Sequence, residues 1–241
     1  MRTILLKFSG PLQSWGTSSH FETRHTDWYP SKSAVIGLIA AAFGYRRDQD
    51  EAIRKLSGLD FAVRVDQPGN PMLDYQIAKS RLNVHPYVTR RYYLEDAVFV
   101  AAVGHEDDAW IETIAEALRA PYFQPFMGRR SCPVPADVLL AVADADVLTA
   151  LKQAPWQAAN WYRRRYRWEH PDAKDVKLDV YADAALAATP KGQGMRQDEV
   201  ISFSQKHRRH RFRNEARTQV ILDMPAMGAG GHDAFAALGG A

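Results

Sequence analysis

Apolar residues recur along the chain with two different periods, and these periods predict strands that alternate with helices. The segment RTILLKF (residues 2–8) is almost continuously apolar, which indicates a central strand at the start of the fold. In SKSAVIGLIAAAFG (residues 31–44), apolar residues recur every three or four positions, which is typical of one face of a helix. Ser31 or Ser33 is a suitable N-cap for this helix, and Gly44 is placed to end it.

The alternation continues to about residue 142. RRDQDEAIRKLSG (46–58) predicts a short surface helix, LDFAVRVDQPG (59–69) an alternating strand that ends in a turn, and YYLEDAVFVAAVG (92–104) a buried strand. EDDAWIETIAEALRAP (106–121) predicts an amphipathic helix, and RRSCPVPADVLLAV (129–142) supplies the last strand. This βαββαβ order is that of a ferredoxin-like domain, in which a four-stranded antiparallel sheet packs two helices on one face.

We therefore expect an α+β fold whose residues 1–150 form a ferredoxin-like domain, an architecture that RNA-recognition modules share. Residues 71–91 interrupt it as an insert without a core pattern, rich in Asn, His, Pro and Arg. VKLDVYAD predicts a strand and DEVISFSQKHRRHRFR an exposed strand or loop, so residues 151–222 form a smaller, basic, β-rich C-terminal region. The Gly/Ala-rich residues 223–241 are expected to be a disordered tail.

The connection between the first strand and the first helix is unusually long and polar. It has more than twenty residues and is rich in Gly, Ser, Thr, His and Arg, with two Trp. Links between a strand and a helix in compact domains usually take about 2–6 residues. In GPLQSWG we expect a solvent-facing turn with Trp15 at its tip, ended by Gly16. Gln13 and Ser14 would then offer hydrogen bonds to a base edge or a phosphate. The alternative is that Trp15 folds back into the core.

The net charge of +3 hides a strong segregation of charge. Residues 79–91 carry +4 from Lys79, Arg81, Arg90 and Arg91, WYRRRYRW (161–168) carries another +4, and residues 191–217 carry +5, so that the remainder totals −10. Such segregation indicates a polyanionic partner, and the aromatic residues between the arginines favour nucleic acid. The alternative is a set of solvated faces that pair with acidic neighbours.

Three further motifs offer anion-binding groups. In PSKS, the free N–H groups of a helix start lie beside Ser31, Lys32 and Ser33, which predicts an anion site. In GRRSCP, Arg129 and Arg130 stand at the mouth of a predicted strand, where they can clamp a phosphate or stack on a base. SQKHRRHRF offers a basic run that contains Lys206, His207 and Arg208. Helix capping, salt bridges and a disordered basic segment are the respective alternatives.

Other classes of function find little support in the sequence. A Walker A motif is absent, which argues against a nucleoside triphosphatase. The single cysteine excludes an intramolecular disulfide and disfavours a cysteine-based zinc site, so we expect neither a metal nor a cofactor. No apolar run is long enough for a membrane helix and the N-terminus lacks a signal-peptide layout, so a cytoplasmic protein without a membrane partner is expected. Tyr45, His85, Lys206 and His207 could in principle assemble a metal-free RNA-cleaving site, although their spacing does not require it.

Five blocks of the sequence, taken together and in order, resemble the CasD family of CRISPR-associated proteins. The blocks are GPLQSWG, PSKSAVIGLIAAAFG, FAVRVDQPG, YYLEDAVFVAAV and GRRSCP, which span about residues 1–135. DEVISFSQKHRRHR also resembles the segment F-S-Q-R-H-R-R that many members carry near the C-terminus. The resemblance does not extend to residues 145–195 or to the Gly/Ala tail.

The resemblance implies a non-catalytic subunit of the type I-E CRISPR surveillance complex Cascade, which acts in antiviral defence. Such a subunit binds and caps the 5′ handle of crRNA, contacts the backbone subunit and the large subunit that recognises the protospacer-adjacent motif, and meets target DNA indirectly through the complex. The implied fold is a modified ferredoxin-like domain with an inserted β-hairpin thumb, and residues 71–91 lie where the thumb is expected. The long connection would then form a saddle for the RNA handle.

Two other functions remain open. A sister branch of the family cleaves precursor crRNA with a Tyr/Lys/His-type site, and Tyr45 lies where such a tyrosine is expected. A metal-independent endoribonuclease is therefore the main alternative. A stand-alone RNA-binding module is the third possibility, but the long insert and the dispersed basic clusters favour a subunit of an assembly.

Overall fold

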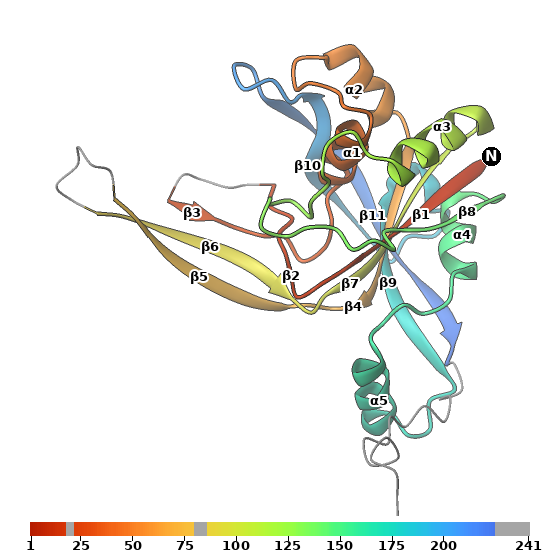
Figure 1. The fold of residues 1–241 in the computed structure, drawn as a ribbon. Helices are drawn as coiled ribbons and strands as arrows, with labels where there is room; N and C mark the ends of the chain where they lie inside the picture. Colours follow the sequence, from red (N-terminus) through yellow and green to blue (C-terminus); the bar gives the residue numbers. More distant parts are fainter. Residues whose placement is uncertain (18–21, 80–85, 225–241) are drawn as a thin grey trace, which may run out of the picture.

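The computed structural model describes residues 1–17, 22–79 and 86–224, and it shows an α+β fold with a body and a projecting arm (Figure 1). Arg81, His85 and the tail from residue 225 onward lie outside the described residues. None of the helices in the described part of the chain has the length and apolarity that crossing a bilayer requires.

The body is built on one seven-stranded sheet with the order β10-β11-β9-β4-β7-β1-β8. The strand bounds are β1 Arg2–Ser9, β4 Asp60–Gln67, β7 Val98–His105, β8 Leu139–Ala143, β9 Asp175–Asp183, β10 Gly192–Ser202 and β11 Arg209–Asp223. All the pairings in this sheet are antiparallel. Because β9 pairs with β4, the strands after residue 150 continue the sheet that the first 150 residues begin.

The expectation of a central first strand is confirmed in that β1 is an inner strand, paired with β7 on one side and with the edge strand β8 on the other. The three C-terminal strands are all added on the far side of β4, which moves the centre of the sheet away from β1. The last two of them, β10 and β11, form a long hairpin where the sequence suggested one exposed strand or a loop.

Helices cover both faces of the sheet. α1 (Lys32–Ala42), α2 (Asp50–Ser57) and α3 (Asp108–Arg119) pack with Leu6 and Phe99 on one face. α4 (Val147–Gln153) packs with Leu5 and Val100 on the other face. A strand covered on both faces is apolar at consecutive positions, which explains the continuous apolar run of β1. The remaining helical elements are α5 (Asn160–Glu169), at the lower end of the body in Figure 1, and the short 3₁₀ turn η1 (Ala184–Leu186).

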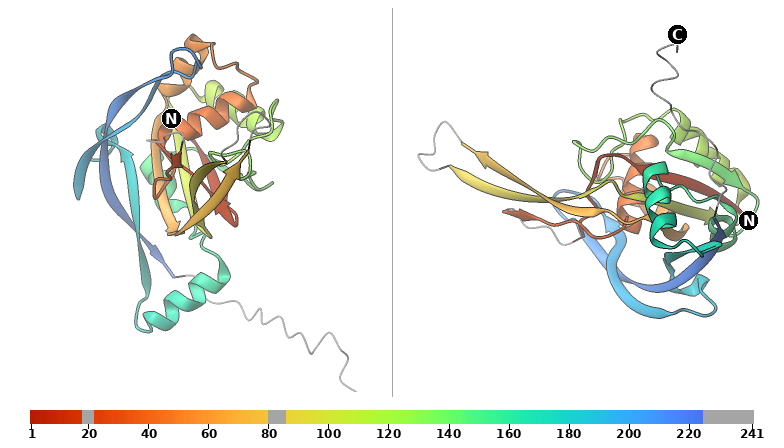
Figure 2. Two further views of the ribbon diagram at one scale, coloured as in Figure 1. Left: turned by 90° about the vertical axis from the view of Figure 1, so that its left-hand side faces the viewer. Right: turned by 90° about the horizontal axis from the view of Figure 1, so that it is seen from below.

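The arm is a second, four-stranded sheet that projects from the body (Figures 1 and 2). Its hairpin consists of β5 (Asn70–Ala78) and β6 (Tyr87–Glu95). On the other side of β6, β2 (Leu12–Gln13) pairs with it antiparallel and β3 (Thr23–Arg24) pairs with it parallel. The long polar connection therefore supplies two short strands of two residues each to the arm.

The predicted strand over residues 92–104 was wrong in extent, since it divides into β6 and β7. Asp96 separates the two strands with a φ of 53°, a left-handed conformation in which the backbone leaves one sheet for the other. An apolar run cannot show such a break, because Leu94, Ala97 and Val98 are buried on both sides of it.

The expected solvent-facing turn at Trp15 was also wrong, and the alternative, a core position, is confirmed. Trp15 is 1% exposed and its ring lies 5.1 Å from that of Phe8. Its indole N–H donates to the side-chain oxygen of Gln13, whose own amide donates to the carbonyl oxygens of Phe8 (3.3 Å) and Ala97 (2.7 Å). The hydroxyl of Ser14 donates to the carbonyl of Tyr92. These polar groups satisfy the buried backbone around the indole, so none of them is free to meet RNA.

Gly128 fixes the loop that follows α3 against this buried turn. Its φ is +79°, and a Cβ built on it would lie 1.6 Å from the carbonyl oxygen of Ser14. Only glycine avoids both the backbone strain and this overlap. The amide of Ser14 donates to the carbonyl of Met127, which closes the contact and brings Arg129 to the base of the arm.

We expect Trp15→Ala to destabilise the protein by about 3–5 kcal/mol, because it removes a buried ring and leaves Gln13 without its donor. Trp28→Ala, at a ring that is 63% exposed, should change the free energy of unfolding by less than about 0.5 kcal/mol. Urea denaturation of both variants measures the difference. Equal effects would contradict the core position of Trp15.

Candidate nucleic-acid interface

The helix start that was expected to bind an external anion already holds one from the same chain. The amide N–H of Lys32 donates to a carboxylate oxygen of Asp198 at 2.8 Å, and Asp198 is fully buried. Ser31 is the N-cap and accepts from the amide of Ala34, while the Ser33 hydroxyl lies 3.2 Å from that of Ser31. The capping prediction is confirmed. In the structure, Asp198 occupies the position beside the Lys32 amide that a phosphate would otherwise take.

Arg213 lies at the centre of a buried ionic cluster around this helix start. Its guanidinium donates to Asp198 at 2.9 and 3.0 Å, to Asp183 at 2.9 Å and to Glu215 at 2.7 Å. The ammonium of Lys32 lies 3.0 Å from Asp183. Burial by itself disfavours the charge of Arg213, but the three carboxylates outweigh burial and raise its pKa above the ordinary value. We call Arg213, Lys32 and these three carboxylates the ionic cluster.

The segment before α1 is attached to the ionic cluster as well. Arg196 donates to Asp27 at 2.7 Å and to the carbonyl of Tyr29 at 3.0 Å. The ring of Tyr29 stacks on Tyr181 with centroids 3.8 Å apart, and its hydroxyl donates to Glu215 at 2.7 Å. Burial and the bond to Glu215 both raise the pKa of Tyr29, so it remains a neutral donor. The end of the long connection is therefore held to β9, β10 and β11.

A different set of arginines gathers at the base of the arm, and we call Arg24, Arg91, Arg129 and Arg130 the arginine group. Arg24 and Arg91 are partners in the β3–β6 pairing. The guanidinium of Arg129 donates to the carbonyl of Arg24 at 2.9 Å and lies 4.5 Å from the ring centre of Tyr93. Within the described residues, no carboxylate forms a salt bridge with any of the four. Asp74 is the cross-strand partner of Arg91 and lies on the same face of the hairpin, but no salt bridge joins the two side chains.

Arg90 is exposed but lies on the opposite face of the hairpin from Arg91, because side chains alternate along a strand. On the face of Arg90, β5 presents Leu73, Tyr75 and Ile77, which are 47%, 56% and 64% exposed. Tyr75 is the cross-strand partner of Arg90. The arm thus has one face with Arg91 and Arg129, and another with apolar side chains around Arg90.

The C-terminal basic run lies apart from the arginine group. Lys206, His207 and Arg208 are all exposed in the turn between β10 and β11, which lies near α2 in Figure 1. Gly16 is exposed where the chain leaves the buried turn. The structure thus joins Arg91 to Arg129 and Arg130, and it separates these arginines from the basic turn.

Sequence reasoning overlooked Arg24, Arg196 and Arg213. Arg24 stands in a segment without any periodic pattern, and only its pairing with β6 places it beside Arg91. Arg213 belongs to the same basic run as Arg208, but it faces inward, where it is 7% exposed. Arg208 lies in the turn before β11, and within β11 the exposed Arg211 has the same parity as Arg213, so no local pattern marks Arg213 as the buried arginine.

Tyr45 follows α1 and its ring stacks on Phe43, with centroids 5.0 Å apart. It packs against the core as a partly buried residue. Among the described residues, no contact joins Tyr45 to Lys206 or His207. Tyr45, Lys206 and His207, which could in principle have contributed to an RNA-cleaving site, are therefore not joined by contacts in the described part of the chain, and His85 lies outside it.

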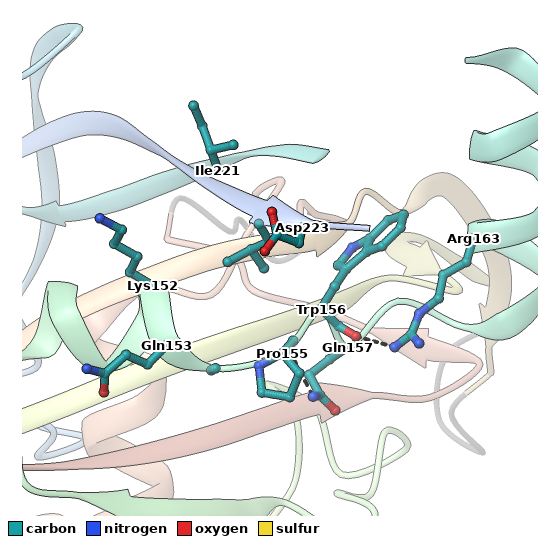
Figure 3. A pocket seen from close by; sticks show the side chains of 10 residues that line it. Lys152, Gln153, Pro155, Trp156, Gln157, Arg163, Ile221 and Asp223 are labelled. Carbon is teal, nitrogen blue, oxygen red and sulfur yellow. Dashed lines mark hydrogen bonds between the residues drawn. The ribbon is translucent and has the colours of Figure 1, made fainter. Parts of the chain in front are cut away.

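A cavity of about 470 Å³ lies away from the arm, between α4, the loop before α5 and the end of β11 (Figure 3). Trp156 and Arg163 form part of its wall, and Arg163 donates to the backbone carbonyl of Trp156. Lys152 contributes a second cation. This cavity is lined by the residues that hold α5 to the body, and none of the arginine group lines it.

Comparisons with known proteins agree on one family. The family model described as "CRISPR-associated protein (Cas_Cas5)" matches residues 3–221. The chain is 31% identical over 163 residues to the CRISPR system Cascade subunit CasD of Escherichia coli strain K12, covering 59% of this chain and 71% of that protein. A solved chain from a "CRISPR RNA-guided surveillance complex" is similar over 96% of this chain and 95% of its own length, with a TM-score of 0.76 and 31% identity. A structure described as "Crystal structure of Cas protein" covers 92% and 95%, with a TM-score of 0.61 and 29% identity.

Arg213→Gln should destabilise the protein by about 3–5 kcal/mol at neutral pH, because it leaves buried carboxylates without their cation. Arg211→Gln is the matched control, since Arg211 is 66% exposed and its pair with Glu199 contributes at most about 1 kcal/mol. Urea denaturation of both variants at pH 7 measures the difference. Equal effects of the two substitutions would contradict the central position of Arg213 in the ionic cluster.

Proposed function

Because the chain belongs to the Cas5 family of CRISPR-associated proteins, we propose that it is a non-catalytic subunit of a Cascade surveillance complex that binds and caps the 5′ handle of crRNA. The observation that carries this proposal is the arginine group, whose guanidinium groups form no salt bridge with a carboxylate of the described residues. By contrast, Lys32, Arg196 and Arg213 are all paired inside the body. The chain thus neutralises its buried cations and leaves the cations at the base of the arm available to a polyanion.

The strand order supports the ferredoxin-like assignment. The strands β8-β1-β7-β4 are adjacent and antiparallel, and α1 and α3 pack on the same face of them. We infer that these elements are a modified ferredoxin-like core, that the β5–β6 hairpin is the inserted thumb, and that β9, β10 and β11 form the C-terminal β-rich addition.

The arginine group fits an RNA backbone that bends around the base of the arm. Guanidinium groups bind phosphates with two parallel hydrogen bonds and can also stack on bases. Arg129 is held in place by Tyr93 and by the carbonyl of Arg24, so part of its conformational entropy is lost before RNA binds. His25 stacks on Tyr92 at 5.3 Å, but Tyr92 is the cross-strand partner of Leu73 and lies on the face of the arm opposite Arg91, so this stack is not part of the surface of the arginine group.

Two surfaces fit the other partners of such a complex. The exposed apolar face of the arm, with Leu73, Tyr75 and Ile77, is suited to burial against the backbone subunit. The basic turn with Lys206 and Arg208 offers further phosphate contacts. Contact with the large subunit, and with target DNA through the complex, is part of the same proposal.

We expect Arg91→Gln and Arg129→Gln to weaken binding of a handle oligoribonucleotide. Each substitution should lower the slope of log K against log salt by about 0.7, the value for one phosphate contact to a single strand. Arg119→Gln is the control. Arg119 is 53% exposed and pairs with Glu112, and both residues belong to α3, which lies on the other side of α1 from the arm (Figure 1). Fluorescence anisotropy over a salt series measures the slopes. Unchanged slopes in both arm variants would remove the arginine group from the interface.

The endoribonuclease alternative predicts a different result from the same preparation. We expect no specific cleavage when labelled repeat RNA is incubated with the protein, either in EDTA or with Mg²⁺, because Tyr45 packs on Phe43 apart from His207. Gel analysis of the RNA is the measurement. Cleavage at one position that disappears in Tyr45→Phe or His207→Ala would establish the nuclease instead.

A further inference from the structure

α5 is an unusual helix, because it is short and strongly basic and has no fully buried residue. An isolated helix of ten residues is marginal in water, so packing must hold it in place. That packing comes from one face only. Tyr162 and Tyr166 contact the buried ring of Trp156 edge-on at 6.3 and 5.5 Å, and Arg163 donates to the carbonyl of Trp156.

The loop that carries Trp156 is itself held by a fully buried ion pair. Arg64 donates to Asp66 at 2.6 and 2.8 Å, and to the carbonyls of Ala154 and Pro155 at 2.8 and 2.9 Å. The indole of Trp156 donates to the carbonyl of Asp66 at 2.8 Å. Burying an ion pair costs several kcal/mol of desolvation, and an apolar pair would stabilise a core equally well. The Arg64–Asp66 pair instead holds the loop of residues 154–156 in one position, and this loop sets the orientation of α5.

The outward face of α5 carries a regular stripe of aromatic and cationic side chains. Trp161, Arg164, Arg165 and Trp168 have the spacing i, i+3, i+4, i+7 and therefore lie along one side of the helix. The two Trp residues are 44% and 82% exposed. Arg165 pairs with Glu169, the only acid in the helix. A Trp side chain that is 82% exposed contributes little to the free energy of folding, so the stripe is better suited to binding than to stabilising the fold.

We propose that this tryptophan–arginine stripe binds a single-stranded nucleic acid, as a second interface separate from the arm. The two indoles lie about 10 Å apart along the helix axis, whereas stacked bases follow one another every 3.4 Å or so along each strand of a duplex. Each indole would therefore take its own base from an unstacked strand, and the two arginines between them would neutralise the phosphates. Aromatic stacking beside cations is the general mode of binding to single strands.

α5 lies away from the arm, at the end of the sheet where β9 begins and β11 ends (Figures 1 and 2). This inference does not depend on the function proposed for the arm. A strand held at the arm could leave the α5 stripe free for a different strand, or for a distant part of the same one.

Photo-crosslinking tests the stripe directly. The probe is a single-stranded oligothymidylate that carries 5-iodouracil, added to the full chain and to the assembled complex. We expect crosslinks to map to Trp161 or Trp168. In anisotropy measurements, Trp168→Ala should weaken binding about 5- to 100-fold, as expected for the loss of one stacked base. Arg164→Gln together with Arg165→Gln should lower the salt slope by about 1.4.

The matched controls are Tyr122→Ala, at an exposed ring on another part of the body, and Arg119→Gln. Both should bind the oligonucleotide as the unchanged protein does. Crosslinks confined to the arm, with unchanged affinity in Trp168→Ala, would overturn the inference and leave the role of the arm intact. Loss of assembly in the stripe variants with unchanged oligonucleotide affinity would identify a docking surface for an acidic protein, which also overturns it.

Discussion

The architecture depends on the bidentate contact between Arg213 and Asp198 at the N-terminus of α1. Asp198 neutralises the partial positive charge of the helix start and accepts the amide of Lys32, while Arg213 neutralises Asp198. Because α1 follows the long connection and Arg213 lies in the last strand, this contact joins the first and last parts of the fold. It sets where the connection ends, and hence where β2 and β3 can reach the arm.

Burial, as at the contact between Arg213 and Asp198, explains why arginine side chains have two different roles in this protein. Inside the body, a cation left unpaired would carry a large desolvation penalty, so Arg64, Arg196 and Arg213 each contact carboxylates. At the arm, water screens the charge, and arginines that form no salt bridge with a described carboxylate are tolerated. Segregated charge in the sequence was therefore a correct sign of a basic surface, but the total overstated it, because part of it is neutralised internally.

The arm and α5 are both elements that the body fixes without burying. β6 is held by β2 and β3, which come from the connection, and α5 is held by Trp156 above the Arg64–Asp66 pair. In each case the fixed backbone presents aromatic and cationic side chains to solvent. Fixed presentation reduces the entropy lost on binding, which suits a protein that acts as a rigid part of a larger assembly.

The sequence by itself determined the elements and the family. The apolar period of three to four predicted α1 and α3, Ser31 was identified as a possible cap, and five ordered blocks indicated the family that the comparisons then showed. These features are local, because each depends on residues close together in the chain. The existence of an insert at residues 71–91 was also visible, since it lacks a core pattern.

Only the tertiary structure decided which polar residues are free. Gln13, Ser14 and Lys32 have the composition of a binding site, but partners far along the chain occupy their polar groups. Arg24 and Arg91 became neighbours only through the pairing of β3 with β6. A hydrogen bond or ion pair between distant residues depends on distances that no local pattern contains. For this reason the sequence could indicate a class of partner, and only the fold showed which cations are paired inside the body.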